Sequence, residues 1–246
     1  MSDSAFSFLG RTLRRRSFLR VAGATAASSA LVLAGCGSDD TETPTPTTPG
    51  ALTFSNDNLG LLNYVYLLEQ LEAAFYQKVV SSFPLDFTAA DRAAFIDLRD
   101  HEVIHRETLK FALGSNAYDA NAGTNALVFN FTSLALTSRS EVYAAARTLE
   151  DVGVAAYNGV AKLLQIAPDG SHLTYLKLLV KLASVEARHA AFVRDQVQAS
   201  SFADADVVTA TGDLAGLDIV KTPVEVTALI AKYVPITLVA TSLPTI

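Results

Sequence analysis

Apolar residues recur every three or four positions in four long stretches of the chain, which is the spacing of one face of an α-helix. In the first stretch, residues 61–80, this face includes Leu62, Val65 and Val79. Three further stretches with the same spacing follow at residues 88–112, 138–164 and 171–193. The pattern therefore predicts four helices, each with one face buried in a common core.

Helix starts and connection lengths indicate how these helices are joined. Thr88 followed by Asp91, and Ser138 followed by Glu141, have the spacing of capping boxes. The first and second helices, and the third and fourth, are joined by short connections, whereas a long one separates the second from the third. We therefore expect an all-α four-helix bundle, made of two antiparallel pairs with one long crossover.

The tail, residues 200–246, begins with a loop-like segment and contains one short helix. Thr222 and Glu225 form its capping box, with Pro223 at the first helical position. We expect this C-terminal helix to pack over an end of the bundle.

Each predicted buried face carries a carboxylate where the helical period demands hydrocarbon. The second and fourth helices also bury a histidine, because each contains the pattern Glu-x-x-His. An uncompensated carboxylate in a dry core costs several kcal/mol and would normally bind a proton instead. No lysine or arginine lies on these faces, so bound metal is the economical partner. The predicted ligands are Glu69, Glu102, His105, Glu150, Glu186 and His189.

An internal repeat supports this ligand set. Residues 68–76 align with residues 149–157, and each segment leads to a Glu-x-x-His. The alignment pairs Glu69 with Glu150 and Glu72 with Gly153, so Glu69 is the better ligand. Glu72 becomes a candidate for contacting the ligands or exchanging with one of them.

Two tyrosines occupy matching places in the repeat. Tyr76 and Tyr157 each follow the lone glutamate of their helix by one heptad. They are interpreted as core residues, with the alternative that one of them lies beside the metals as a redox or hydrogen-bonding partner.

The ligand types favour iron or manganese. Carboxylate oxygen and imidazole nitrogen suit these metals, and Cys36 is the single cysteine of the chain. A zinc–thiolate cluster or a cysteine-ligated iron therefore cannot form within one chain. We expect two iron ions, or alternatively two manganese ions.

With these motifs in place, residues 61–197 resemble the ferritin-like superfamily, with the duplicated Glu and Glu-x-x-His arrangement of the rubrerythrin type. The sequences of Leu68–Tyr76 and Val185–Ala190 are most similar to those of exported bacterial ferritin-like proteins related to desiccation-associated proteins. The resemblance implies oxidation of Fe(II) by dioxygen or peroxide at a di-iron centre with the six ligands named above. Rubrerythrins also use a cysteine-ligated iron, and this chain lacks the cysteines for it. Cage-forming ferritins lack a lipid tether, whereas the N-terminal segment of this chain predicts one at Cys36, which disfavours iron storage in a shell.

The N-terminal segment has the features of an export signal. Arg14–Arg20 followed by an apolar stretch resembles a twin-arginine signal, and Leu33–Cys36 resembles a bacterial lipobox. We expect residues 1–35 to be removed and Cys36 to be lipidated; the alternative is an ordinary small residue in a signal helix. Residues 36–55 then form a Thr/Pro-rich tether, and residues 56–199 an extracytoplasmic bundle attached to a membrane.

The predicted signal holds five of the 19 basic and one of the 25 acidic residues, which leaves 14 against 24 and a net charge of −10. Such a charge makes nucleic acid an unsuitable partner. The expected partners are metal ions, dioxygen or peroxide and, through the lipid, a membrane. The oligomeric state stays open, a homo-oligomer included.

Two other interpretations compete with the di-metal centre. His101–His105 matches the His-Glu-x-x-His pattern of zinc metalloproteases, but His101 lies about 100° away from Glu102 around the helix. A bundle whose buried acids are satisfied by hydrogen bonds, without metal, is the second. It corresponds to a non-catalytic lipoprotein that acts as a binding or protective module under stress.

Overall fold

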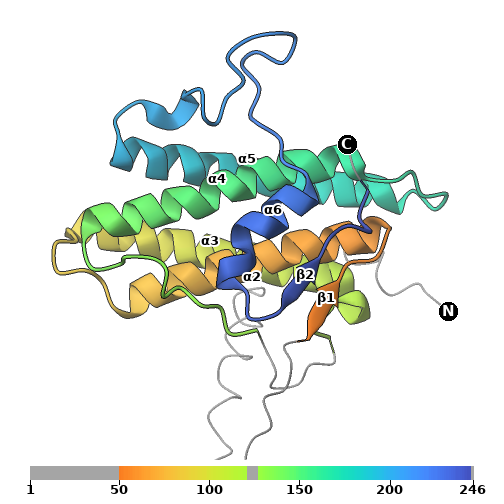
Figure 1. The fold of residues 1–246 in the computed structure, drawn as a ribbon, viewed down its shortest axis with the longest axis horizontal. Coiled ribbons are helices and arrows are strands. Elements are labelled where there is room, and N and C mark those ends of the chain that lie inside the picture. Colours follow the sequence, from red (N-terminus) through yellow and green to blue (C-terminus); the bar gives the residue numbers. More distant parts are fainter. Residues whose placement is uncertain (1–49, 121–126, 245–246) are drawn as a thin grey trace, which may run out of the picture. The chain divides into compact units, whose positions relative to one another are not determined.

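The computed structural model describes residues 50–120 and 127–244 of the chain (Figure 1). The expectations for the signal, for lipidation at Cys36 and for residues 36–49 of the tether lie outside these residues. No helix within the described ranges combines the length and apolar character needed to cross a membrane.

Four long helices form the body of the molecule, which confirms the predicted all-α bundle. Helix α2 packs mainly against α3, and α4 mainly against α5, so the bundle consists of two hairpins. The connection between α3 and α4 is the long crossover, and its residues 127–138 run along the side of the bundle (Figure 1). The bounds are Asn58–Ser81 for α2, Ala89–Leu113 for α3, Arg139–Leu163 for α4 and Ser171–Val197 for α5.

Local signals begin these helices as the sequence indicates. Capping boxes form at Thr88 and at Ser138, where the hydroxyl and the acid three residues later exchange hydrogen bonds with backbone amides. Asp57 caps α2 by accepting from the backbone N–H of Gly60. Gly170 precedes α5 with φ at 74°, a left-handed conformation that favours glycine.

Aromatic rings close the core at one end of the bundle. Phe95 is 0% exposed, and its ring centroid lies 5.1 Å from those of Phe87 and Tyr143 and 5.5 Å from that of Tyr76. These distances are typical of favourable aromatic pairs. The cluster joins α2, α3 and α4, and so holds the two hairpins together.

A pair of short parallel strands ties the two ends of the described chain together. Strand β1, Ala51–Thr53, pairs with β2, Thr237–Val239, and Phe54 beside it is 2% exposed. The predicted tether extends to residue 55, and its last residues are therefore ordered. The reason is that alternating apolar side chains at Leu52 and Phe54 pack inward while the backbone finds a partner strand far along the chain.

The C-terminal helix forms as predicted but lies elsewhere. Helix α6, Pro223–Ile230, begins with the capping box at Thr222 and packs against the side of α4 rather than over an end of the bundle. Lys221 donates its backbone N–H to the carbonyl of Ala155 on α4. A Cβ at Gly159 would lie 2.3 Å from the Lys221 carbonyl, so glycine there permits this close crossing.

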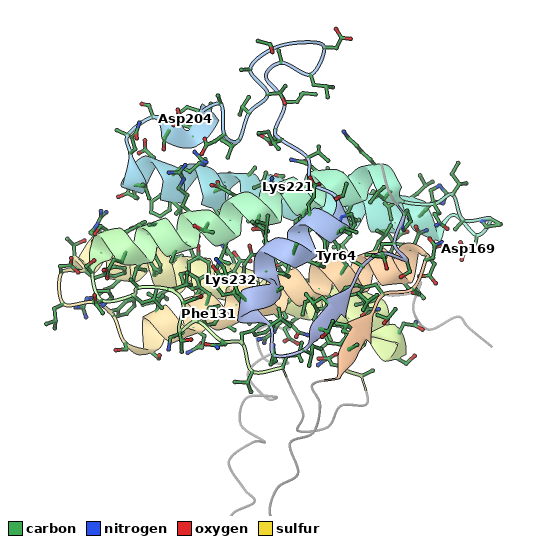
Figure 2. All side chains as sticks on the ribbon, in the orientation of Figure 1. Tyr64, Phe131, Asp169, Asp204, Lys221 and Lys232 are labelled. Carbon is green, nitrogen blue, oxygen red and sulfur yellow. The ribbon has the colours of Figure 1, made fainter. Side chains whose placement is uncertain are left out.

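Charged loop residues lie at the two ends of α5. Asp169 precedes this helix and Asp204 follows it, and Figure 2 shows the two residues at opposite ends of the bundle.

Candidate metal centre

The six side chains that the sequence predicts as metal ligands meet inside the bundle. The four glutamates are 0% exposed and the two histidines 4% exposed. All four long helices contribute to this cluster, with Glu69 on α2, Glu102 and His105 on α3, Glu150 on α4, and Glu186 and His189 on α5.

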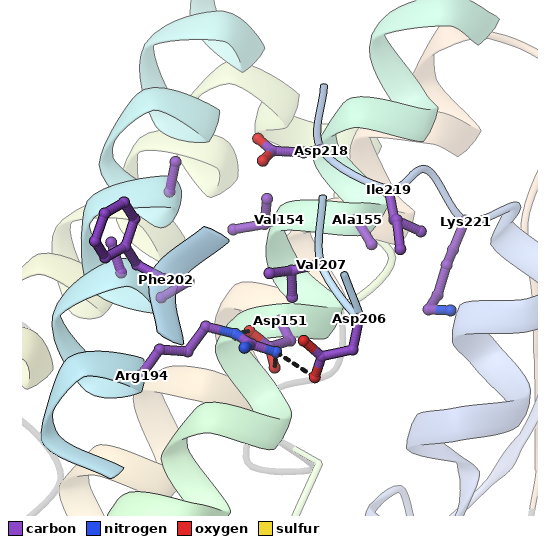
Figure 3. A pocket seen from close by; sticks show the side chains of 13 residues that line it. Asp151, Val154, Ala155, Arg194, Phe202, Asp206, Val207, Asp218, Ile219 and Lys221 are labelled. Atoms are coloured by element: carbon purple, nitrogen blue, oxygen red, sulfur yellow. Dashed lines mark hydrogen bonds and ion pairs between the residues drawn. The ribbon is translucent and has the colours of Figure 1, made fainter. Parts of the chain in front are cut away.

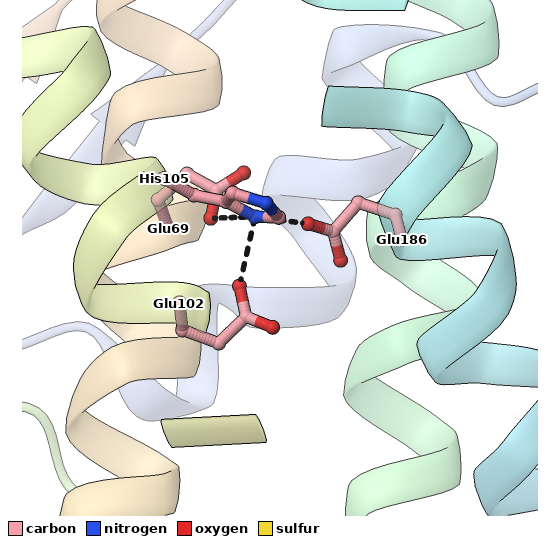
Figure 4. Close-up of side chains that lie close together, drawn as sticks. All are labelled: Glu69, Glu102, His105 and Glu186. Carbon is pink, nitrogen blue, oxygen red and sulfur yellow. Dashed lines mark ion pairs between the residues drawn. The ribbon is translucent and has the colours of Figure 1, made fainter. Parts of the chain in front are cut away.

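Three carboxylates surround His105. Its Nδ1 lies 2.6 Å from Glu186 Oε1, 3.3 Å from Glu102 Oε2 and 3.4 Å from Glu69 Oε2. Glu69 and Glu186 reach the imidazole from opposite sides, and Glu102 reaches it from below in the view of Figure 4. One atom from each of these four residues lies within 4.8 Å of the others, a grouping that could hold a metal ion.

A second group of the same kind surrounds His189. Its Nδ1 lies 2.7 Å from Glu102 Oε1, 3.7 Å from Glu186 Oε2 and 3.8 Å from Glu150 Oε2. Glu102 and Glu186 thus present one oxygen to each histidine and belong to both groups, whereas Glu69 and Glu150 belong to one each. The two groups are therefore adjacent and are joined by two shared carboxylates.

Most of the converging atoms have no hydrogen-bond partner among the described residues. Both carboxylate oxygens of Glu102 and of Glu186, and Nδ1 of His105 and of His189, have no hydrogen bond within the described residues. The contacts of 2.6 and 2.7 Å are short, yet they lack the alignment of hydrogen bonds. Buried polar atoms are normally satisfied. Atoms that point at a shared centre fit a cation held between them.

Comparison with known families agrees with this fold. Residues 57–199 match the ferritin-like domain family. The chain belongs to this family. A comparison with curated proteins returns no match. Ferritin-like membership and the buried Glu/His cluster are together compatible with a metal site.

Burial opposes charge on Glu69 and Glu150, the two glutamates of this ferritin-like domain that belong to one group each. Burial raises the pKa of Glu69, and Glu186 raises it further. Burial likewise raises the pKa of Glu150. In the part of the chain that the structure describes, histidines are the partners of these carboxylates in ion pairs. Protons therefore collect here when no cation is present.

The histidines and the shared carboxylate shift in the complementary directions. Burial disfavours the charged form of His189, but Glu150 and Glu102 outweigh it and raise its pKa to about 11. Burial also disfavours charge on Glu102, but His105 and His189 outweigh it and lower its pKa to about 2. A metal ion that binds these atoms must displace the protons.

Two tyrosines bond the unshared glutamates crosswise. The hydroxyl of Tyr76, on α2, donates to Glu150 Oε1, and that of Tyr157, on α4, donates to Glu69 Oε1. In both glutamates Oε2 has no hydrogen-bond partner among the described residues. The tyrosines thus occupy one oxygen of each carboxylate and leave the other facing the histidine of its group.

Glu72 lies beside the centre but in neither group. It is 2% exposed, and burial, with Glu186 and Glu102, raises its pKa. A Cβ at Gly153 would lie 2.7 Å from Glu72 Oε1. Glycine on α4 therefore makes the space that the Glu72 carboxyl fills, which gives a physical reason for the Glu72 and Gly153 pairing in the repeat.

His101 has a contact that the sequence did not reveal. Its Nδ1 lies 3.0 Å from Nε2 of His189, and the two rings stack with centroids 5.2 Å apart. It belongs to neither ligand group, so the described residues do not assemble the His-Glu-x-x-His zinc site. Its position about 100° from Glu102 around the helix indicated only that its side chain leaves the buried face.

A second polar cluster lies between α4, α5 and the segment after residue 200, next to a hollow of about 80 Å³. Arg194 is 1% exposed there and donates to both oxygens of Asp151 and to one oxygen of Asp206 (Figure 3). It also donates to the backbone carbonyl of Ser201. Since Nε, Nη1 and Nη2 of this guanidinium all donate hydrogen bonds, the cluster has a structural role and fixes the segment after residue 200 to α4 and α5.

Proposed function

We propose that this ferritin-like domain binds two divalent metal ions, one in each ligand group. The observation that carries the proposal is the sharing of Glu102 and Glu186, whose two oxygens are divided between His105 and His189. Four ligand carboxylates balance the charge of two divalent ions when the histidines bind as neutral imidazoles. Glu72, whose pKa is raised by burial, then stays protonated.

The metal we propose is iron, with manganese as the alternative. Each group offers three carboxylates and one imidazole, a donor set that suits these ions. The chain's single cysteine, Cys36, precedes the described residues and belongs to neither group. The ligand role of all six residues is part of this proposal.

For the reaction, we propose oxidation of Fe(II) by peroxide or dioxygen. Two Fe(II) ions held by the six ligands would supply one electron each, which with two protons is enough to reduce one hydrogen peroxide molecule to two water molecules, or one dioxygen molecule to hydrogen peroxide. The chain's own residues create the setting. The buried glutamates would hold the positive charge in the interior of the bundle, where electrostatic interactions are stronger than in bulk water. Tyr76 and Tyr157 hold the unshared carboxylates in one orientation.

The cellular setting is also proposed from the sequence. The twin-arginine-type signal and the lipobox at Cys36 support an exported protein that is held at a membrane by a lipid. The likeness to exported ferritin-like proteins related to desiccation-associated proteins supports a role in oxidative or drying stress. Detergent partition of the protein expressed with its own signal, compared with a Cys36→Ala variant, tests the lipid anchor.

Metal analysis of the purified protein tests the proposed centre. We expect about two iron or manganese ions per chain, and loss of both in a Glu102→Ala, Glu186→Ala double variant. Stopped-flow absorbance after Fe(II) and peroxide are mixed then tests the reaction. Full metal content without Fe(II) oxidation would indicate the non-catalytic binding module. A wild-type protein that takes up no metal would refute the centre itself.

A further inference from the structure

We propose that His101 is a positioning residue that orients His189 for metal binding. The inference rests on the proposed di-metal centre but concerns a residue outside its ligand set. His101 Nδ1 lies 3.0 Å from His189 Nε2, the nitrogen that points away from the glutamates. Nδ1 of His189 points at them, 2.7 Å from Glu102 Oε1. The two ring nitrogens of His189 therefore face different partners.

The direction of this hydrogen bond follows from the ligand role. A histidine that binds metal through Nδ1 carries its proton on Nε2, so His189 Nε2–H donates to Nδ1 of His101. The outer N–H of a ligand histidine is normally taken up by a carboxylate, a carbonyl or water. Here a neutral imidazole takes that place, so the bond fixes the ring without adding negative charge to a centre already rich in carboxylates.

Ring packing supports the same role. The His101 and His189 rings are 15° from parallel, and His189 also stacks with His105 at 22° and 5.9 Å between centroids. The His189 ring thus stacks with two imidazoles of α3, those of His101 and His105. His101 itself is exposed, so the bond links a buried ligand to the surface of the bundle.

The second half of the repeat lacks this partner. His105 corresponds to His189 when Glu102 is aligned with Glu186, and the residue that then corresponds to His101 is Val185. Valine offers no side-chain donor or acceptor. The proposal therefore predicts an effect at one metal position, and Val185 supplies a matched control on the opposite Glu-x-x-His helix.

The test compares His101→Phe, which keeps a stacking ring without nitrogen, with His101→Asn, whose Oδ1 can replace Nδ1 as acceptor. Co(II) is titrated anaerobically into each full-length protein, followed by absorbance. We expect His101→Phe to weaken one of two Co(II) sites by about 10- to 100-fold, the usual cost of losing such a partner, and to leave the other unchanged. His101→Asn should recover most of the affinity, and Val185→Ala should change neither site.

A second readout needs no metal. In ¹H–¹⁵N spectra of the metal-free protein, we expect the Nε2 proton of His189 to be protected from exchange in the wild type and in His101→Asn, and to exchange quickly in His101→Phe. If both Co(II) affinities survive His101→Phe, or if the proton exchanges equally fast in all three proteins, the positioning role is wrong. Should the wild type bind no Co(II), the di-metal proposal fails, and the exchange measurement still decides the role of His101.

Discussion

The sharing of two glutamates between the ligand groups leads to a graded prediction about stability. Glu186 presents one oxygen to each group, whereas Glu150 belongs to the His189 group alone. Glu186→Gln should therefore weaken both metal positions and Glu150→Gln only one. Glutamine keeps the shape of the side chain, so the bundle should fold in both variants.

The expected sizes follow from binding linkage. A ligand at 100 times its dissociation constant stabilises the folded state by about 2.7 kcal/mol per site. Two sites give about 5 kcal/mol, and a domain of this size gains about 2–4 °C in Tm for each kcal/mol. Metal should thus raise the Tm of the wild type by roughly 10–20 °C and that of Glu150→Gln by about half as much. Glu186→Gln should show little rise.

Differential scanning calorimetry with and without Mn(II) measures these shifts, and Mn(II) avoids oxidation during the scan. Glu107→Gln on α3 is the matched control, because Glu107 is partly exposed, pairs with Arg106 and belongs to neither group. Equal losses in Glu186→Gln and Glu150→Gln would refute the sharing of Glu186. A wild-type shift retained in both variants would refute the ligand set.

Three further predictions concern single residues. Gly153→Ala should displace the flexible Glu72 carboxyl and change the unfolding free energy by less than about 1 kcal/mol, since alanine favours helix by a similar amount; urea titration and a crystal structure check this. Phe95→Ala should cost about 3–5 kcal/mol in the same titration because the ring is fully buried. Burial raises the pKa of Asp91, but the bond from Arg139 outweighs it and lowers that pKa. The stabilising effect of the charged Asp91 is therefore present above pH about 4 and is lost as the pH falls. Asp91→Asn should reduce that loss of stability in acid denaturation curves.

The helices and the Glu/His cluster could be predicted from the sequence because both depend on the short-range spacing of buried positions along the chain. A buried face repeats every three or four residues, so a glutamate on that face, such as Glu69 or Glu150, stands out as a violation of the pattern. The structure brings these violations together in one place. Capping boxes such as that at Thr88 are local for the same reason, since their partners lie three residues apart.

The features that the sequence did not reveal all depend on contacts between distant segments. Strand β1 forms only because β2 lies beside it, and three-residue strands carry almost no pattern of their own. Tyr76 is spaced like a core residue, and its bond to Glu150 depends on how α2 faces α4. His101 was placed correctly off the buried face, but that placement says nothing about the neighbouring helix that it meets.

The departures from the internal repeat indicate that the two proposed metal positions are not equivalent. At each of the two departures, a polar side chain of the first hairpin contacts the second hairpin. Glu72 fills the space left by Gly153, which lies one turn after Glu150. His101 contacts His189, whereas the residue that corresponds to His101 in the second half of the repeat is Val185. A duplicated site with matching ligands thus has unmatched surroundings. Ligand identity alone would make the two positions alike, so any difference between them in affinity must come from these neighbouring side chains.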